Sequence, residues 1–222
     1  MNEQVNLAKV QQRAAVFFEE IGWQPAKDPL PKIVIDPQLD ADFRFANQTI
    51  SVSSPEHAFY ALTKYGRDQA TGQLAQKSYL AALKERCLMI DIGRKFYSLA
   101  DLKAIVRSMA CFQFTHLQLH FSENEGFRIE SQQFPEIVSE ECLTKQEIRE
   151  LIAYAQNHEI AIIPDFDSPG HLRQVLAQKH QWQLPTADGT RDDRALNILD
   201  SEAVAFIQEV YHHLCNFFQI AY

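Results

Sequence analysis

The chain has 222 residues, of which 46% are hydrophobic and 23% are charged, a composition typical of one large globular domain or two small ones. It carries 21 Lys and Arg residues against 29 Asp and Glu residues, which gives a net charge of −8. This acidic balance argues against binding to nucleic acid, because phosphate attraction needs clustered Lys and Arg, and it favours a neutral or cationic small ligand.

Residues 1–80 are predicted to form an N-terminal helix followed by a small α/β segment. Apolar residues recur at helical spacing as far as Ile21, and Gly22 is expected to end that helix. A proline-containing connector then leads to a short strand within KIVID. The segment FRFANQTISVS is predicted to be a β-hairpin with its turn near Ala46–Asn47.

A second helix is predicted in PEHAFYALTKYG, from Pro55 to Gly66, since proline suits a first helical turn and glycine a helix end. Residues 67–80 are polar and are predicted to be a linker. No internal repeat is found at the periods of solenoid proteins.

From residue 86 onward, short apolar strands alternate with helices. The strands are expected in CLMIDIG, THLQLHF and IAIIPDF. The helices are expected in SLADLKAIVRSMACF, LTKQEIRELIAYAQNHE, HLRQVLAQKHQW and LDSEAVAFIQEVYHHLCNFF. Ser98 and either Asp200 or Ser201 are predicted helix caps, and Thr144 with Glu147 forms a predicted capping box. Alternating strands and helices predict a parallel sheet.

The ends of the strands decide between an open sheet and a barrel. The turn after the first strand, DIGRKFYS, has one glycine and a charged pair, so it lacks the glycine-rich phosphate cradle of nucleotide-binding open sheets. Polar residues gathered at the ends of successive strands are instead typical of barrel enzymes. The sequence therefore predicts an α/β fold, a partial (β/α) TIM-type barrel over 86–222. The residues that follow the strands are Asp91, Arg94, His120, Glu123, Glu125, Asp165, Asp167 and His171.

Arg94 is the first candidate for ligand binding. Its guanidinium offers a planar fork of donors that suits two neighbouring hydroxyls or a carboxylate. The alternative is an ordinary ion pair of Arg94 with Asp91 or Glu85. The loop with Glu123, Glu125 and Arg128 offers further polar groups, and its alternative is a solvated acidic loop.

The segment PDFDSPGHL places Asp165 and Asp167 on the same side of an extended chain, and its Pro–Gly turn presents His171 at the rim. A histidine beside carboxylates suits the handling of protons. The alternative is a surface histidine at the start of a helix. This set could also bind a divalent metal, although no further ligand cluster is evident, and no metal or cofactor is expected.

The four cysteines form no CxxC pair and are expected to be reduced thiols. No run of about 18 apolar residues is present, so no membrane span is expected. The N-terminus lacks the basic start and apolar middle of a signal peptide. A cytoplasmic location is therefore expected.

Three segments together resemble one family. RCLMIDIGRKFYSLADLKAIV, HLQLHFSENEGFRIES and IAIIPDFDSPGHLRQVL resemble the first three barrel strands of family 20 glycoside hydrolases, the β-N-acetylhexosaminidases. The resemblance covers residue 86 to about 218. FYALTKYGRD and the hairpin before it are more weakly similar to the end of the small domain that precedes this barrel.

The resemblance implies hydrolysis of a terminal β-linked N-acetylhexosamine with retention, in which the 2-acetamido oxygen of the sugar is the nucleophile. It implies that Arg94 grips the ring hydroxyls and that Glu123 and His171 support the general acid. Glu123 departs from the usual Asp, and Asp165 from the usual Glu. Further substrate contacts are expected from Asp91, Glu125, Arg128, Asp165 and Asp167, with a glycan that contains N-acetylhexosamine as partner.

In the family, an Asp–Glu pair after the fourth strand orients the acetamido group and supplies the general acid. The printed sequence stops at Tyr222, where the fourth strand is expected to begin. The chain alone is therefore expected to lack the Asp–Glu pair and to have little or no activity. Two alternatives remain open. One is a non-catalytic half-barrel that assembles with itself or with a C-terminal partner chain, because three strands leave open sheet edges. The other is a sugar-binding module.

Overall fold

The computed structural model describes residues 7–23 and 30–218. Contacts divide the chain into two compact units, of which the first comprises 1–87, 103–116 and 153–161 and the second comprises 88–102, 117–152 and 162–222. Two helices, α3 (Leu99–Cys111) and α4 (Lys145–Asn157), and the strands of the second sheet therefore contribute residues to both units.

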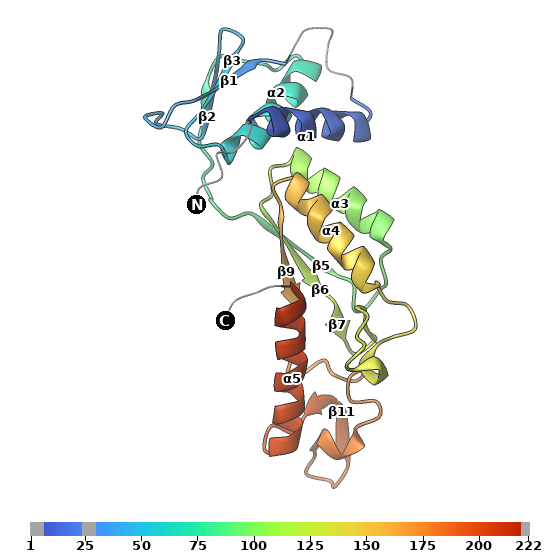
Figure 1. Ribbon diagram of the computed structural model, residues 1–222. Coiled ribbons are helices and arrows are strands. Elements are labelled where there is room, and N and C mark those ends of the chain that lie inside the picture. Colours follow the sequence, from blue (N-terminus) through green and yellow to red (C-terminus); the bar gives the residue numbers. More distant parts are fainter. Residues whose placement is uncertain (1–6, 24–29, 219–222) are drawn as a thin grey trace. The chain divides into compact units, whose positions relative to one another are not determined.

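A four-stranded sheet and two helices form most of the first unit (Figure 1). The sheet has the order β1-β3-β2-β4, with β3 parallel to β1 and antiparallel to β2. Its elements are α1 (Leu7–Glu20), β1 (Lys32–Ile35), β2 (Phe43–Ala46), β3 (Thr49–Val52), α2 (His57–Ala70) and β4 (Ser78–Tyr79). The predicted first helix, short strand and hairpin are confirmed, while residues 1–6 and most of the proline-containing connector lie outside the described residues.

The aromatic residues of α1 and α2 form the core of this unit. Phe17 lies 5.9 Å from Phe59 and 5.7 Å from Phe18 between ring centroids, and all three side chains are almost fully buried. Burying rings of this size contributes most of the hydrophobic stabilisation available to so small a unit.

The prediction that the second helix ends at Gly66 is wrong, because α2 continues to Ala70. Gly66 is buried, and a Cβ there would lie 2.5 Å from Trp23 and 2.7 Å from Phe18. The glycine therefore makes room for two aromatic rings instead of ending the helix. The predicted linker 67–80 is also wrong in part, since it contains the last turn of α2 and strand β4, which pairs with β2.

The second sheet has the order β5-β6-β9, from the strands β5 (Cys87–Asp91), β6 (His116–His120) and β9 (Ala161–Asp165). The Thr115 N–H donates to the Arg86 carbonyl at one end, and the Ile92 N–H donates to the His120 carbonyl at the other. β5 and β6 therefore run in the same direction, as predicted. The Ala161 N–H donates to the Thr115 carbonyl and the Phe121 N–H to the Asp165 carbonyl, so β9 also runs in this direction and the C-terminal ends of the three strands lie together.

The helix caps follow the predicted chemistry. The Thr144 hydroxyl accepts the N–H of Glu147 at 3.1 Å, while the Glu147 carboxylate accepts the N–H of Thr144 at 2.8 Å, which completes the capping box of α4. Asp200, one of the two cap candidates, accepts the N–H groups of Glu202 and Ala203 at the start of α5 (Ser201–Phe218).

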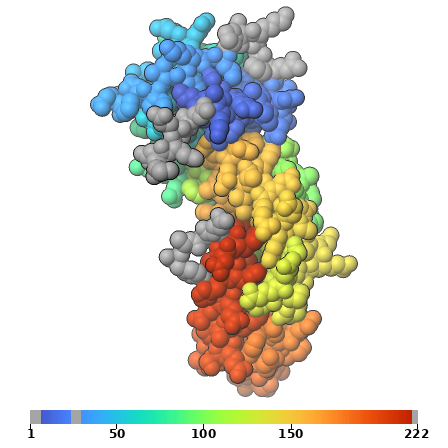
Figure 2. Space-filling model, viewed as in Figure 1, coloured from blue at the N-terminus to red at the C-terminus, as the bar shows by residue number. Residues whose placement is uncertain are grey.

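The predicted helix in HLRQVLAQKHQW is wrong. The segment forms turns and a short 3₁₀ helix, η2 (His180–Trp182), followed by a hairpin that was not predicted. The hairpin pairs β10 (Gln183–Pro185) with β11 (Arg191–Leu196) in antiparallel fashion. Trp182 packs on Phe206 of α5 with ring centroids 5.0 Å apart, and the orange surface of this region adjoins the red surface of α5 in Figure 2.

Two further short elements complete the second unit, the hairpin of β7 (Ser122–Glu123) with β8 (Gly126–Phe127) and the 3₁₀ helix η1 (Pro135–Ile137). None of the helices in the described part of the chain combines the length and the apolar character that a membrane span requires.

Candidate active site

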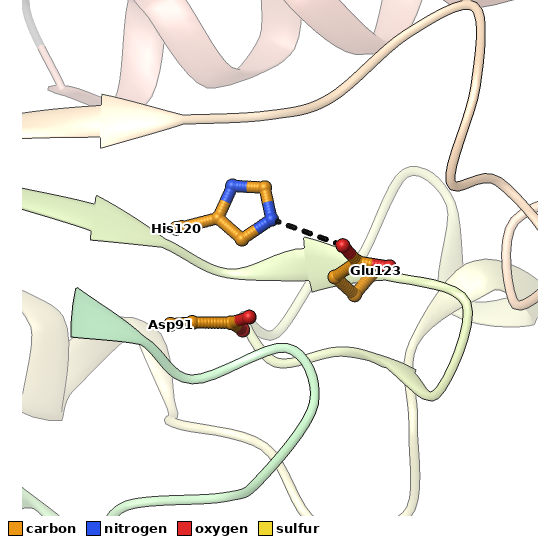
Figure 3. Close-up of side chains that lie close together, drawn as sticks. All are labelled: Asp91, His120 and Glu123. Carbon is orange, nitrogen blue, oxygen red and sulfur yellow. Dashed lines mark ion pairs between the residues drawn. The ribbon is translucent and has the colours of Figure 1, made fainter. Parts of the chain in front are cut away.

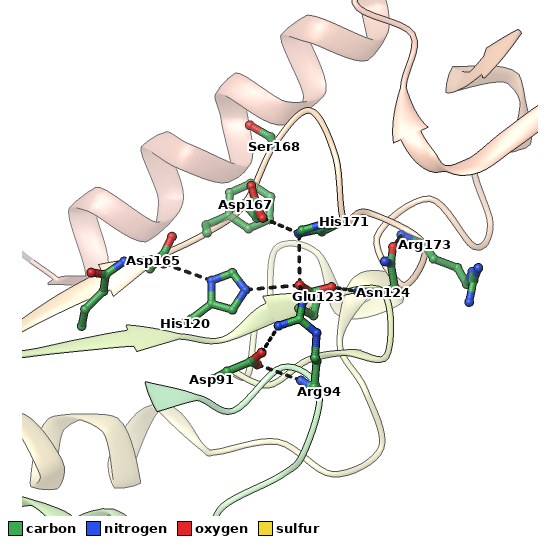
Figure 4. A network of polar contacts seen from close by, with 12 residues as sticks. Asp91, Arg94, His120, Glu123, Asn124, Asp165, Asp167, Ser168, His171 and Arg173 are labelled. Atoms are coloured by element: carbon green, nitrogen blue, oxygen red, sulfur yellow. Dashed lines mark hydrogen bonds and ion pairs between the residues drawn. The ribbon is translucent and has the colours of Figure 1, made fainter. Parts of the chain in front are cut away.

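Polar side chains from three strand ends meet around one buried carboxylate, that of Glu123. Glu123 lies on β7, just past the end of β6, and its side chain is 1% exposed. Its Oε1 atom accepts a hydrogen bond from Nη2 of Arg94 and lies 3.0 Å from Nδ1 of His171. Its Oε2 atom accepts the N–H of Asn124 at 2.9 Å. A buried carboxylate is stable only when it is paired in this way (Figure 4).

Arg94 reaches Glu123 from the loop after β5. Its backbone N–H and its Nη1 atom both donate to the carboxylate of Asp91, at 3.0 and 2.5 Å. The alternative for Arg94, an ion pair with Asp91, is thus present in the structure, and ligand binding by Arg94 stays a prediction. Desolvation lowers the pKa of Arg94, but the hydrogen bond with Asp91 and the charges of Glu123, Asp91 and Glu125 outweigh it, so the net pKa is raised. The side chain is 56% exposed, which leaves donors open to a ligand.

His171 follows β9 and contacts two carboxylates at once. Its Nδ1 atom lies 2.7 Å from Oδ2 of Asp167 and 3.0 Å from Oε1 of Glu123, while 49% of its side chain is exposed. The histidine therefore joins a buried acid to an accessible surface. Such a chain of ionisable groups is suited to holding a proton donor in place.

His120, which the sequence places at the end of its strand without a specific role, forms a second link. Its Nδ1 atom lies 3.0 Å from Asp165, and its Nε2 atom lies 3.7 Å from Oε1 of Glu123. Asp165 also accepts a hydrogen bond from Gln118 at 2.7 Å. The available signal was the period of two along β6, which places Gln118 and His120 on one side of the strand.

Arg128 and Glu125 are connected to the cluster around Glu123 less directly than the other predicted site residues. The Arg128 guanidinium is buried and donates to the backbone carbonyls of Gly93, Glu141 and Glu125, at 3.3, 3.0 and 3.4 Å. These bonds connect the loop of Arg94 to the loop of Glu123. Glu125 itself is exposed.

Two groups of side chains have the spacing of metal ligands. Asp91, His120 and Glu123 offer ligand atoms within 4.8 Å of one another (Figure 3), and so do Glu123, Asp167 and His171. In both groups the shared ligand is Glu123, whose Oε1 already carries the Arg94 guanidinium. A cation would therefore compete with an existing positive charge, and the expectation of no metal stays a prediction.

The first unit contains a cavity of about 910 Å³. Its lining includes Arg86, His116 and Ala161, at the beginnings of the strands whose ends carry the site. The cavity contains none of the residues predicted to bind substrate, and we assign it no part in the chemistry.

The sequence of residues 84–222 matches the model of glycosyl hydrolase family 20, catalytic domain. The chain belongs to family 20. The match covers most of the chain and contains every residue of the cluster around Glu123, so the family resemblance is confirmed.

Several curated relatives of this family 20 chain are β-hexosaminidases. One from Akkermansia muciniphila is 38% identical over 107 residues, which is 41% of this chain and 22% of the relative. One from Vibrio furnissii is 31% identical over 127 residues, which is 47% of this chain and 21% of the relative. The matched segments thus span about a fifth of these relatives' lengths.

Solved structures share the α/β fold of this family 20 chain. A mutant β-hexosaminidase from Streptomyces plicatus in complex with GlcNAc has a TM-score of 0.77 at 18% identity, over 97% of this chain and 51% of that one. The β-N-acetylglucosaminidase of Vibrio harveyi in complex with N-acetylglucosamine has a TM-score of 0.75 at 17% identity, over 99% of this chain and 41% of that one. The chain spans about half of these structures.

Proposed function

We propose that this chain contains the sugar-binding part of the active site of a β-N-acetylhexosaminidase, an enzyme that removes terminal β-linked N-acetylhexosamine from glycans. In this proposal the 2-acetamido oxygen of the sugar is the nucleophile and the configuration is retained. The strands β5, β6 and β9, with the helices after them, would be the first three units of the catalytic barrel. The observation that carries the proposal is the cluster of Arg94, Glu123 and His171 in a chain that belongs to family 20.

Each residue has a proposed role that follows from its contacts. Arg94 has exposed donors and binds ring hydroxyls, and the partly exposed carboxylates of Asp91, Asp165 and Asp167 accept hydrogen bonds from a sugar. Glu123 and His171 support the general acid. Glu125 is exposed and remains a proposed substrate contact. Arg128, whose donors reach backbone carbonyls, would act by holding the loops of the other groups.

None of the residues with a proposed role matches the general acid or the acetamido-orienting Asp of the family. We therefore propose that the 222 residues alone bind the sugar but hydrolyse its glycosidic bond only slowly. Release of a chromophore from an aryl β-N-acetylglucosaminide measures this. Turnover near that of a full-length family member, lost in Glu123→Gln, would contradict the proposal, because Glu123 itself would then serve as the acid.

Sugar binding is tested by titrating N-acetylglucosamine into the 222-residue chain and following the amide signals by NMR. We expect millimolar binding in the wild-type chain and none in Arg94→Ala. The matched control is Arg194→Ala, since Arg194 is equally exposed (57% against 56%) and is also paired with an aspartate of the same unit. Equal binding by both variants would remove Arg94 from the proposed site.

A second function, assembly through the open sheet, rests on a different observation. β5 and β9 are the edges of their three-stranded sheet, and their apolar residues Met89 and Ile163 are 52% and 42% exposed. Edges of this kind pair with further strands, from a second copy or from a partner chain. Light scattering that shows a folded monomer at high concentration would contradict assembly with a second copy.

A further inference from the structure

The backbone of His171 has an unfavourable conformation. Its φ angle is +56°, in the left-handed region, which is unfavourable for residues other than glycine. The neighbouring Gly170 does not have a φ angle in this region, although glycine adopts it freely. A Cβ at Gly170 would meet no atom within 4 Å. The conformation of His171 must therefore be imposed by contacts of the surrounding chain.

Strand β11 holds the chain on both sides of His171. The N–H of Leu172 donates to the carbonyl of Arg194 at 2.9 Å, and the N–H of Leu196 donates to the carbonyl of Pro169 at 2.8 Å. Leu172 and Leu196 are both buried. The unpredicted hairpin thus captures the turn in which His171 lies, which is why residues after His171 do not form the expected helix.

Asn124 connects the turn of His171 to Glu123, the residue that His171 contacts. Its Oδ1 atom accepts the N–H of Arg173 at 3.3 Å, while its own N–H donates to Oε2 of Glu123 at 2.9 Å. Arg173 is also tied to the hairpin, since its Nε atom lies 3.0 Å from Asp193. Figure 4 shows Asn124 beside Arg173 and next to Glu123. One residue therefore touches both the loop of Glu123 and the turn of His171.

We propose that Asn124 is a positioning residue, whose side-chain carbonyl holds the His171 turn at the separation where Nδ1 of His171 meets Glu123. The proposal rests on the proposed function, in which His171 supports the general acid. Asn124 touches neither sugar nor acid in this scheme and acts through His171. Loss of its side chain would let the turn, together with the strand β11 that is bonded to it, move away from Glu123.

The test uses the 222-residue chain, labelled with ¹⁵N. In Asn124→Ala we expect the Arg173 amide to exchange with solvent roughly 3- to 10-fold faster, as expected for one lost hydrogen bond, and the ring nitrogen signals of His171 to shift. In Asn124→Asp, which keeps the Oδ1 acceptor, we expect both readouts to return toward those of the wild type. The His171 signals are assigned with His171→Gln.

The matched control is Asn197→Ala. Asn197 is also half-buried, lies in the same unit, and accepts a backbone N–H, that of Leu199, with its Oδ1 at 3.3 Å. We expect this variant to leave the His171 and Arg173 signals unchanged. Should Asn124→Ala fail to fold, Asn124→Ser replaces it with the same expected result, because its shorter side chain cannot reach Arg173.

Unchanged His171 ring signals in a folded Asn124→Ala or Asn124→Ser chain would overturn the proposal, and so would an equal change in Asn197→Ala. Neither readout uses the sugar. A wild-type chain that fails to bind N-acetylglucosamine would therefore count against the proposed function and leave the positioning result standing.

Discussion

Nδ1 of His171 lies 3.0 Å from Oε1 of Glu123, and the two side chains differ sharply in burial, at 49% and 1% exposed. The pair links a carboxylate sealed from solvent to a ring that a ligand can reach. The histidine turn, the buried acid and Arg94 come from three separate strand ends, so their meeting depends on how the loops are held.

Replacing Glu123 by Gln tests whether its charge holds these loops. The amide would turn an NH₂ group toward donors that now meet a carboxylate oxygen, so we expect the free energy of unfolding to fall by about 1–3 kcal/mol. Urea unfolding followed by Trp182, in the same unit, measures this. Glu123→Asp keeps the charge one methylene further away, and we expect a smaller loss. Wild-type stability in Glu123→Gln would mean that the ion pairs contribute nothing to the fold.

Replacing Gly126 by Ala tests the role of Arg128. The new Cβ would lie 2.5 and 2.8 Å from Cζ and Nη2 of Arg128, a side chain fixed on three carbonyls. We expect a loss of about 1–3 kcal/mol in urea unfolding, the usual effect of overpacking. Gly170→Ala is the control, since nothing lies within 4 Å of its added Cβ, and it should change stability by less than about 0.5 kcal/mol. Similar values for both variants would show that Arg128 moves aside freely.

Truncating Phe17 tests the packing of α1. Phe17 is 2% exposed among the rings of Phe18, Phe59 and His158, so Phe17→Ala should destabilise the first unit by about 3–5 kcal/mol. Fluorescence of Trp23, in a Trp182→Phe background, follows this unit alone. Val16→Ala, on the exposed face of the same helix, should change stability by less than about 0.5 kcal/mol. A loss as large at Val16 would contradict the burial seen here.

The stability of the first unit should depend on pH through His158. Burial lowers the pKa of His158 below its ordinary value of 6.5, against the opposing effects of Tyr154 and Glu20. Below pH 6.5 the unfolded chain then binds a proton that the folded chain refuses. The contribution of neutral, buried His158 to the free energy of unfolding is therefore fully present above pH 6.5 and is lost as the pH falls through the lowered pKa.

Urea unfolding followed by Trp23 between pH 5 and pH 8 measures this dependence, again in the Trp182→Phe background. His158→Gln should flatten the decline below about pH 6.5. The pKa of His213, in the second unit, is also lowered by burial and by Lys145, so His213→Gln should leave the Trp23 curve unchanged. An unaltered slope in His158→Gln would assign the pH dependence to other groups.

Local patterns predicted most of the regular elements, because period and capping act over a few residues. The capping box of Thr144 and Glu147 starts a helix as predicted, and the polar ends of β5, β6 and β9 carry the cluster. The failures lie where distant chain overrides local preference. Gly66 lies inside a helix instead of ending it, at a position where Trp23 and Phe18 leave no room for a Cβ.

The sequence by itself determined the alternation of strands and helices, the polar residue types at the strand ends, and the family to which they belong. Only the tertiary structure decided that Glu123 is buried against Arg94 and His171, that His120 joins them, and that Asn124 bridges their loops. The physical reason is the distance along the chain over which each interaction acts. A strand's period sets the side on which a residue lies, whereas the distance between two loops depends on hydrogen bonds such as that from Leu172 to Arg194, which join residues far apart in the chain.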